Sequence, residues 1–495
     1  MTGVRLPKVV SPQSASFQID AAAVPAIRVA IAEIARAGYC EVGVRERLGL
    51  TDITELKWKG LPIYRAERLA TRDVQAIAME LFLMQGDVAA SELGLLLSPA
   101  SVEALVSAGL LTIDPSKRVR ANASLFPVAD RLVFSDHAWH KLPHPGYTTV
   151  PRDQVMFVGD DSRWLARATV RRRVRSSLDL CTGSGVQAIL AAAHSERVLA
   201  VDVNPRAVDC ARLNAMISGA TNMEVAAGDL FEPAGAGERF DLITANPPFV
   251  VSPVDEILFR DGGPSGEAVQ RRIVAGLPNH LAPGGTAQVI TELGEREGEG
   301  EPVIQRVREW LGGAPMDIYM LRLRTYSPGY YAVGHATREG DYGDYLDSVG
   351  AWAANLRAHG YRQVVLALIA FQWSDAPFDR VDEAQPPKRA AGAEIEAVFS
   401  RQRCKGSLGR VQRSGEIALS ESRVLGSSIQ GVASATLLGR AITIEHMLNA
   451  VEREILIRLE KPMDASELPE LLKLDRSIVF AAIDSLRRSG LITDK

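Results

Sequence analysis

Four short motifs between Ser177 and Phe249 constrain the fold of this chain more than any other feature. In chain order they are LDLCTGSGVQAIL (178–190), LAVDVNP (199–205), GDLF (228–231) and TANPPF (244–249). Each motif contains or follows a short apolar run, and helical patterns separate the runs. Apolar runs separated by helices are typical of an α/β sheet. Ligands of α/β sheets bind beyond the carboxyl ends of the strands, so the motifs predict one shared site.

The alternation of apolar runs and helical patterns extends from residue 171 to residue 372 and predicts an α/β fold. The candidate strands are 177–180, 198–202, 223–226, 242–245, 287–291, 316–323 and 364–370. We expect them to form a seven-stranded, mostly parallel, Rossmann-like sheet with helices packed against it.

With 495 residues, the chain is too long for a single ordinary core. The sheet domain is expected at 146–375, and a segment rich in Pro, Ala and charge follows it. We interpret 376–440 as a linker with some helix. Mainly helical domains are expected on either side, at 1–145 and 441–495.

Both terminal domains contain a similar pattern, at 87–114 and 463–495, in which ASEL precedes a leucine cluster and a second helix. This order is typical of winged-helix modules, which either read nucleic acid or serve as docking elements. The candidate recognition helix 475–489 carries Arg476, Arg487 and Arg488 as well as Asp484, whereas the corresponding segment 99–108 has no Lys or Arg.

Bulk properties indicate a cytoplasmic protein. The net charge of −4 argues against a chain that coats nucleic acid along its whole length. The four cysteines form no CxxC pair, which favours a reducing compartment without a structural zinc site. No apolar run of 18 residues occurs, so no membrane segment is expected.

The turn after the first strand predicts close contact with a ligand. Gly183 and Gly185 allow the backbone to approach it, and a helix N-terminus with unpaired N–H groups follows. Asp202 ends the second strand, where a carboxylate can accept hydrogen bonds from ribose hydroxyls, and Asp229 follows the third. Dinucleotide-binding enzymes share the features of the first two strands, so these residues alone leave the cofactor open.

Asn246, Pro247, Pro248 and Phe249 distinguish between the cofactors. Two prolines form a rigid turn without N–H donors, so the Asn246 side chain and backbone carbonyls are available to a substrate amino group. Phe249 offers a flat surface on which a planar group can stack. A nitrogen conjugated to a carbonyl or ring is a poor nucleophile, and such a clamp would orient it for methyl transfer without a strong general base.

In these motifs the chain resembles the HemK-like (PrmC-type) N-methyltransferases, over roughly residues 153–372. The block FRDGGPSGEAVQRRIVAGLPNHLAPGGTAQVITELGE (259–295) is also similar to that family. The resemblance implies that S-adenosyl-L-methionine (SAM) is the cofactor. The residues themselves predict no metal site. The residues that would bind SAM are Asp179, Cys181, Gly183, Gly185, Asp202, Asp229 and Asn246, and residues 246–249 would hold the acceptor.

The chain departs from the family pattern at two positions. Cys181 occupies the place of the family's first glycine. Phe249 replaces the tyrosine that is typical of glutamine methylation, and NPPF is similar to motifs of enzymes that methylate exocyclic amino groups of bases.

Three further features have alternative interpretations. His137, His140 and His144 could bind a metal, but no Cys or carboxylate completes a ligand set, so loop residues near the substrate are favoured. The arginines at 171, 172, 173 and 175 form either a solvated face or part of a nucleic-acid track. The insertion 326–360 either shapes the acceptor pocket or caps the sheet.

We therefore expect an enzyme, a SAM-dependent N-methyltransferase that acts on a planar nitrogen of a macromolecule. The sequence slightly favours a base of RNA or DNA as this macromolecular substrate. The first alternative is a glutamine amide of a translation factor. A small-molecule substrate and a non-catalytic SAM-binding regulator are the others.

Overall fold

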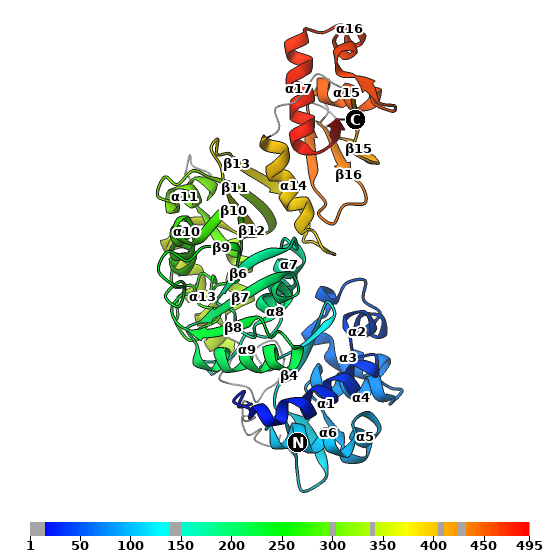
Figure 1. Cartoon of the computed structure of the whole chain (residues 1–495), viewed down its shortest axis with the longest axis vertical. Helices are drawn as coiled ribbons and strands as arrows, with labels where there is room; N and C mark the ends of the chain where they lie inside the picture. Colours follow the sequence, from blue (N-terminus) through cyan, green and yellow to red (C-terminus); the bar gives the residue numbers. More distant parts are fainter. Residues whose placement is uncertain are drawn as a thin grey trace.

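The computed structural model describes residues 15–138, 151–296, 303–336, 342–403, 410–422 and 432–494. Along the longest axis of the molecule, an N-terminal part is followed by a central sheet and then by a C-terminal part (Figure 1). Among the residues so described, no helix is both long and apolar enough to cross a bilayer.

The central sheet has eight strands in the order β13-β11-β12-β10-β9-β6-β7-β8. Their bounds are β6 (Val174–Leu180), β7 (Ser195–Asp202), β8 (Met223–Ala227), β9 (Phe240–Ala245), β10 (Leu281–Arg296), β11 (Met316–Tyr326), β12 (Tyr361–Trp373) and β13 (Asp379–Glu383). All seven predicted strands are present, and the α/β fold class is confirmed. The eighth, β13, lies in the segment expected to be a linker and pairs in parallel with β11.

Strand order and direction place a ligand crevice at the centre of the sheet. The five strands β8, β7, β6, β9 and β10 are parallel, whereas β12 is antiparallel to both β10 and β11. The chain runs outward from β6 to β8 and then returns to β9 on the other side of β6. Such a reversal separates the connecting loops at the carboxyl ends of the strands and leaves room for a ligand.

Side chains on the two faces of the sheet pack against different helices. Leu199 and Val201 of β7 belong to the cluster that includes α10 (Ala268–His280) and α11 (Val303–Trp310). Val198 and Ala200 lie in the cluster formed with α8 (Val186–Ala192). Because side chains alternate between faces along a strand, one apolar run supplies both layers.

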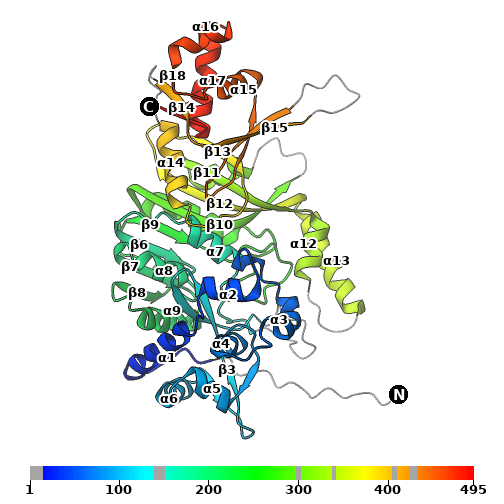
Figure 2. The ribbon, with the colours of Figure 1, turned by 90° about the vertical axis from the view of Figure 1, so that its right-hand side faces the viewer.

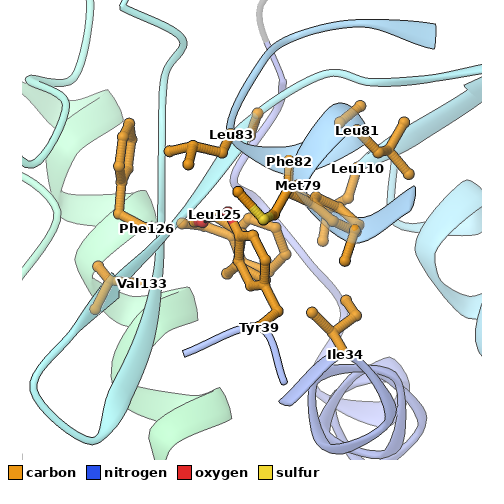
Figure 3. Close-up of a cluster of buried hydrophobic side chains, with 14 of the residues drawn as sticks. Ile34, Tyr39, Met79, Leu81, Phe82, Leu83, Leu110, Leu125, Phe126 and Val133 are labelled. Carbon is orange, nitrogen blue, oxygen red and sulfur yellow. Dashed lines mark hydrogen bonds between the residues drawn. The ribbon is translucent and has the colours of Figure 1, made fainter. Parts of the chain in front are cut away.

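The N-terminal part consists of short helices around a large apolar cluster, part of which Figure 3 shows. Its helices are α1 (Val24–Arg36), α2 (Glu41–Leu48), α3 (Leu61–Arg68), α4 (Val74–Phe82), α5 (Ala90–Leu96) and α6 (Pro99–Ser107). A three-stranded sheet and a hairpin complete it, formed by β1 (Asp87–Ala89), β2 (Leu111–Ile113), β3 (Arg118–Ala121), β4 (Ser124–Val128) and β5 (Arg131–Ser135). Tyr39 is buried in the cluster and donates its hydroxyl to the Leu125 carbonyl oxygen at 2.6 Å.

This part packs on α9 (Pro205–Ser218), which Asn204 caps as predicted. Figures 1 and 2 both show α9 between the sheet and α1. The fully buried Asn214 amide accepts from the Phe134 N–H at 2.8 Å and donates to the Phe134 carbonyl oxygen. Arg206 forms a two-pronged ion pair with the buried carboxylate of Asp136. These buried polar contacts fix the N-terminal part relative to the sheet.

The C-terminal part begins with α14 (Gly392–Arg403) and contains two small sheets. One sheet has the order β18-β14-β19 and packs with α15 (Ala450–Arg458), α16 (Leu468–Leu472) and α17 (Arg476–Ser489) around a single apolar cluster. Its strands are β14 (Arg410–Arg413), β18 (Met463–Asp464) and β19 (Ile492–Asp494), and the other sheet is formed by β15 (Ile417–Ser422), β16 (Val432–Leu437) and β17 (Glu445–Leu448). The winged-helix assignment of both terminal parts stays a prediction.

Protonation of His137 is expected to destabilise the N-terminal part. Its ring contacts the Ser124 hydroxyl at 2.7 Å and the Ala121 carbonyl oxygen at 2.9 Å, and burial lowers its pKa to about 4. An unfolded chain protonates histidine near pH 6.5, so stability is complete above about pH 6.5 and falls as the pH is lowered towards 4. Between pH 7 and pH 5 the free energy of unfolding should decrease by about 2 kcal/mol through this residue.

Urea unfolding at the two pH values measures this loss. The variant His137→Gln, which cannot take up a proton, should show a smaller decrease than the wild type. Equal decreases in the two proteins would contradict the assignment.

Candidate functional site

A pocket of about 290 Å³ lies at the carboxyl ends of β6, β7, β8 and β9. Residues from all four strand ends line it, together with residues of the segment 154–158 that precedes α7 (Asp160–Ala168). The four sequence motifs therefore meet at one place, as predicted.

The turn after β6 forms one wall of this pocket. Cys181 and Gly183 both line it and have positive φ angles of 54° and 55°. A Cβ added to Gly183 would meet no atom within 4 Å, so this part of the turn faces open space. Gly185, in contrast, does not line the pocket, and an added Cβ would lie 3.1 Å from the Ala211 Cβ. Gly185 therefore allows α8 to pack closely on α9.

Asp179 is a buried carboxylate at the end of β6. One oxygen accepts from the Thr182 hydroxyl at 2.5 Å and the other from the Thr244 hydroxyl at 2.7 Å. Burial raises the pKa of Asp179 to about 6, although the two hydroxyl groups act in the opposite direction. A cation beside this side chain would favour its charged form.

Asp202 and Asp229 line the pocket at the ends of β7 and β8. One Asp202 oxygen accepts from the Gly183 N–H at 2.8 Å and the other from the Asn204 N–H at 2.9 Å. Burial raises the pKa of Asp202, whereas these backbone donors lower it. The Asp229 carboxylate accepts from Arg272 at 2.8 Å, which also lines the pocket.

Asn246 and Pro248 also line the pocket, directly after β9. The Asn246 Nδ2 group donates to Asp161 at 3.1 Å and to the Ser162 hydroxyl at 3.2 Å. Its Oδ1 atom is buried and has no hydrogen-bond partner among the described residues. Pro247 is buried and does not line the pocket.

Phe249 does not line the pocket either. It is 9% exposed and belongs to a buried cluster that includes Trp164 and Tyr331. The expected stacking surface for a planar substrate is therefore packed into the protein. Burial of the Phe249 ring in this apolar cluster stabilises the conformation of the acceptor loop.

The glycine-rich block after the acceptor motif holds residues 249–251 in place. Val250 exchanges backbone hydrogen bonds with Arg260 and Gly262. A Cβ on Gly262 would lie 2.9 Å from the Phe249 carbonyl carbon, and one on Gly266 would lie 2.8 Å from the Phe249 oxygen. Only glycine permits this close approach of two backbone segments.

The insertion between β11 and β12 forms two helices, α12 (Pro328–His335) and α13 (Tyr342–Ala358), which Figure 2 shows beside the sheet. The Tyr331 hydroxyl of α12 accepts from the Val251 N–H at 3.0 Å and donates to Glu292 at 2.5 Å. Asn355 of α13 donates to the Pro264 carbonyl oxygen at 2.9 Å. The insertion thus supports the acceptor loop from behind.

Several pocket residues were not predicted from the sequence. Gln154, Ser162 and Gln187 line the pocket, as does Asp261, whose carboxylate accepts from two backbone N–H groups and from Arg260. A sequence signal was present for Gln154 and Ser162. Gln154 precedes the apolar run VMFV (155–158) and Ser162 ends the segment DDS (160–162), a pattern that is typical of a strand-like segment before a helix start.

The pocket fits the predicted cofactor by the chemistry of its groups. Carboxylates stand at the ends of three successive strands, where the hydroxyl, amino and cationic groups of SAM need acceptors. Gln154 Oε1 and Gln187 Oε1 are buried and have no hydrogen-bond partner within the described ranges. A buried acceptor without a hydrogen-bond donor raises the free energy of the folded protein. A bound ligand that donates to these two oxygens would remove this cost.

Of the three histidines singled out in the sequence, one lies within the described residues. His137 is buried in the N-terminal part, whereas His140 and His144 lie outside the described residues. No group of metal-ligating side chains occurs among the residues that the structure describes.

The arginines at 171, 172, 173 and 175 lie at the start of β6, and three of them contact other parts of the protein. Arg171 donates to the Ala166 carbonyl oxygen, Arg172 pairs with Glu396, and Arg175 lies 3.6 Å from Asp241. These contacts tie part of the run to its surroundings, while Arg173 and Arg175 stay exposed, the side chain of Arg175 by 81%. In the C-terminal part, Arg487 of α17 likewise pairs with Asp484 and Asp494.

Residues 158–297 match the family model of the methyltransferase small domain. The chain is 40% identical over 134 residues to the ribosomal protein uL3 glutamine methyltransferase of Bradyrhizobium diazoefficiens, an alignment that covers 24% of this chain and 41% of that enzyme. It is 31% identical over 153 residues to a putative protein N5-glutamine methyltransferase of Methanocaldococcus jannaschii, covering 29% and 76% of the two chains. To the uL3 glutamine methyltransferase of Bordetella pertussis it is 30% identical over 261 residues, covering 46% and 82%.

The chain thus spans less than half of the first of these relatives but more than three quarters of the other two. Residues 158–297, which match the family model, contain the glycine turn, the strand-end carboxylates and the NPPF motif around one pocket. By this similarity over most of two relatives, the chain belongs to the HemK-like family of class I SAM-dependent methyltransferases.

Proposed function

We propose that this protein transfers a methyl group from SAM to the side-chain amide nitrogen of a glutamine in a protein of the translation machinery. The observation that carries the proposal is the Asn246 Oδ1 atom, which is buried, lacks a partner among the described residues and belongs to a pocket-lining residue. It is an acceptor suited to the N–H of a planar amide. The relatives, which are named as glutamine methyltransferases of ribosomal protein uL3 and of release factors, support this substrate class.

SAM is the cofactor of this family, and when bound it supplies an electrophilic methyl group. Asp202 would accept from its ribose hydroxyls, and Asp179 would face its cationic amino-acid end. Asp229, Cys181 and Gly183 would complete the cofactor wall, since all three line the pocket.

The acceptor would be held by Asn246 Oδ1 and by the backbone carbonyl of Pro248, since both residues line the pocket. An amide nitrogen is a weak nucleophile because its lone pair is shared with the carbonyl group. Two acceptors on its N–H groups orient the nitrogen and favour its developing tetrahedral form. The nitrogen gains the methyl group and loses one proton to water after the new bond has formed, so no side chain needs to act as a strong base.

The comparisons support the glutamine alternative and not the nucleic-acid base that the sequence favoured. The base interpretation depended on Phe249 as a stacking platform and on basic recognition helices. Phe249 is packed in a buried cluster, α6 carries no Lys or Arg, and Arg487 of α17 is paired with acidic side chains.

Labelling with radioactive SAM methyl groups tests the substrate class. The full chain should transfer label to a protein in an extract from a strain that lacks the gene, and mass spectrometry should locate one added methyl group on a glutamine. Purified release factor and uL3-containing ribosomes are the first substrates to try. The variant Asn246→Ala should lose about a hundredfold in rate while it still binds SAM, because one preorganised acceptor is gone.

Label found only in RNA or DNA would contradict the proposal in favour of the base. If the gene for Asn246→Ala reversed the phenotype of the strain that lacks the gene, the result would instead indicate a SAM-binding regulator.

Removal of the Asp202 carboxylate should weaken SAM binding. In Asp202→Ala, two ribose acceptors are lost and the Gly183 N–H loses its partner, so the dissociation constant should rise at least about tenfold. Isothermal titration with SAM measures it. Glu196→Ala is the matched control, because Glu196 is exposed at the opposite end of the same strand, and its SAM affinity should not change. Equal affinities of Asp202→Ala and the wild type would refute the cofactor assignment.

A further inference from the structure

We propose that Asp161 is a positioning residue that fixes which end of the Asn246 amide faces the acceptor. The inference rests on the proposed function, in which Asn246 Oδ1 accepts from the substrate amide. It extends that proposal to a residue of α7 that lies 85 positions earlier in the chain.

The argument begins with the symmetry of an asparagine side chain. Its oxygen and NH₂ group occupy nearly the same space, so a half-turn of the amide exchanges an acceptor for a donor. A donor at the pocket would repel the N–H groups of a substrate amide. Asn246 therefore needs a neighbour that selects one of the two orientations.

Asp161 can make this selection, and Ser162 cannot. An ionised carboxylate only accepts hydrogen bonds, so it binds the Nδ2 group and rejects Oδ1. A hydroxyl donates as readily as it accepts, so the Ser162 contact would survive the half-turn. With Nδ2 held by both neighbours, Oδ1 is left without a partner among the described residues.

The position of Asp161 is itself well determined. It lies in the first turn of α7, and the preceding Gly159 leaves room for it, since a Cβ there would lie 2.8 Å from Asp161 Oδ1. Farther along α7, the buried Arg163 donates to the Pro127 carbonyl oxygen at 2.7 Å. Arg167 pairs with Glu41 at 2.9 Å and with Asp52 at 2.8 Å. The N-terminal part thus holds the helix that orients the acceptor clamp.

A charge exchange between the two side chains provides the test. In Asp161→Asn two amides face each other, and in Asn246→Asp two carboxylates do. The double variant has an amide at 161 and a carboxylate at 246, so one oxygen of residue 246 can accept from residue 161 while the other faces the pocket. The net charge of the pair is then the same as in the wild type.

We expect each single variant to lower kcat at least tenfold, and we expect Asp161→Asn to change SAM affinity by titration less than twofold. The double variant should recover at least tenfold over the weaker single variant. Ser162→Ala is the matched control and should lower kcat less than Asp161→Asn. Wild-type kcat in Asp161→Asn, or a double variant no more active than the single variants, would overturn the proposal.

A second readout does not depend on the substrate. In ¹⁵N-labelled full-length protein, the Asn246 NH₂ signals can be assigned by their loss in Asn246→Asp. They should exchange slowly with solvent in the wild type and Ser162→Ala, and at least tenfold faster in Asp161→Asn. Unchanged exchange in Asp161→Asn would overturn the positioning role. Failure of the wild type to methylate any glutamine would refute the proposed function instead, and the exchange rates would still decide the role of Asp161.

Discussion

The fully buried Asn214 amide joins three segments on which the pocket depends. It completes the hydrogen bonds of Phe134 in the N-terminal hairpin, and the same NH₂ group donates to the Ser184 carbonyl oxygen in the glycine turn at 2.9 Å. Because α9 carries Asn214, the hairpin, the helix and the turn cannot shift separately. Loss of any of these bonds would leave a buried polar group unpaired, at a cost of about 1–3 kcal/mol. The N-terminal part is in this way a structural component of the cofactor wall.

The two halves of the site are fixed by different means. On the cofactor side, parallel strand ends carry carboxylates that backbone N–H groups and hydroxyl groups hold in place. On the acceptor side, the chain leaves the sheet, and its loop is held by a second backbone segment, by Tyr331 and by the cluster around Phe249. A rigid loop reduces the entropy that is lost when a substrate is ordered against it, which suits a reaction that relies on orientation.

The sequence was informative wherever a local pattern determines the structure. Apolar runs located all seven predicted strands, and Asn204 followed by Pro205 marked the start of α9. Strand β13 was missed because Asp379–Glu383 is largely polar and pairs at the edge of the sheet, where one neighbour suffices. Phe249 was misplaced because its contacts, such as Trp164 in the same cluster, come from segments distant in sequence. Asp161 was overlooked for the same reason, since nothing in DDS indicates which amide it will meet.

The order β18-β14-β19 has a practical consequence for dissecting the chain. The middle strand comes from residues 410–413, whereas its two partners lie some fifty and eighty residues later. A fragment that starts at residue 441, where the sequence suggested a domain boundary, would leave the backbone N–H and C=O groups of both outer strands without partners. Such open strand edges recruit other chains and lead to aggregation. Soluble expression of the C-terminal part therefore requires a fragment that begins ahead of β14.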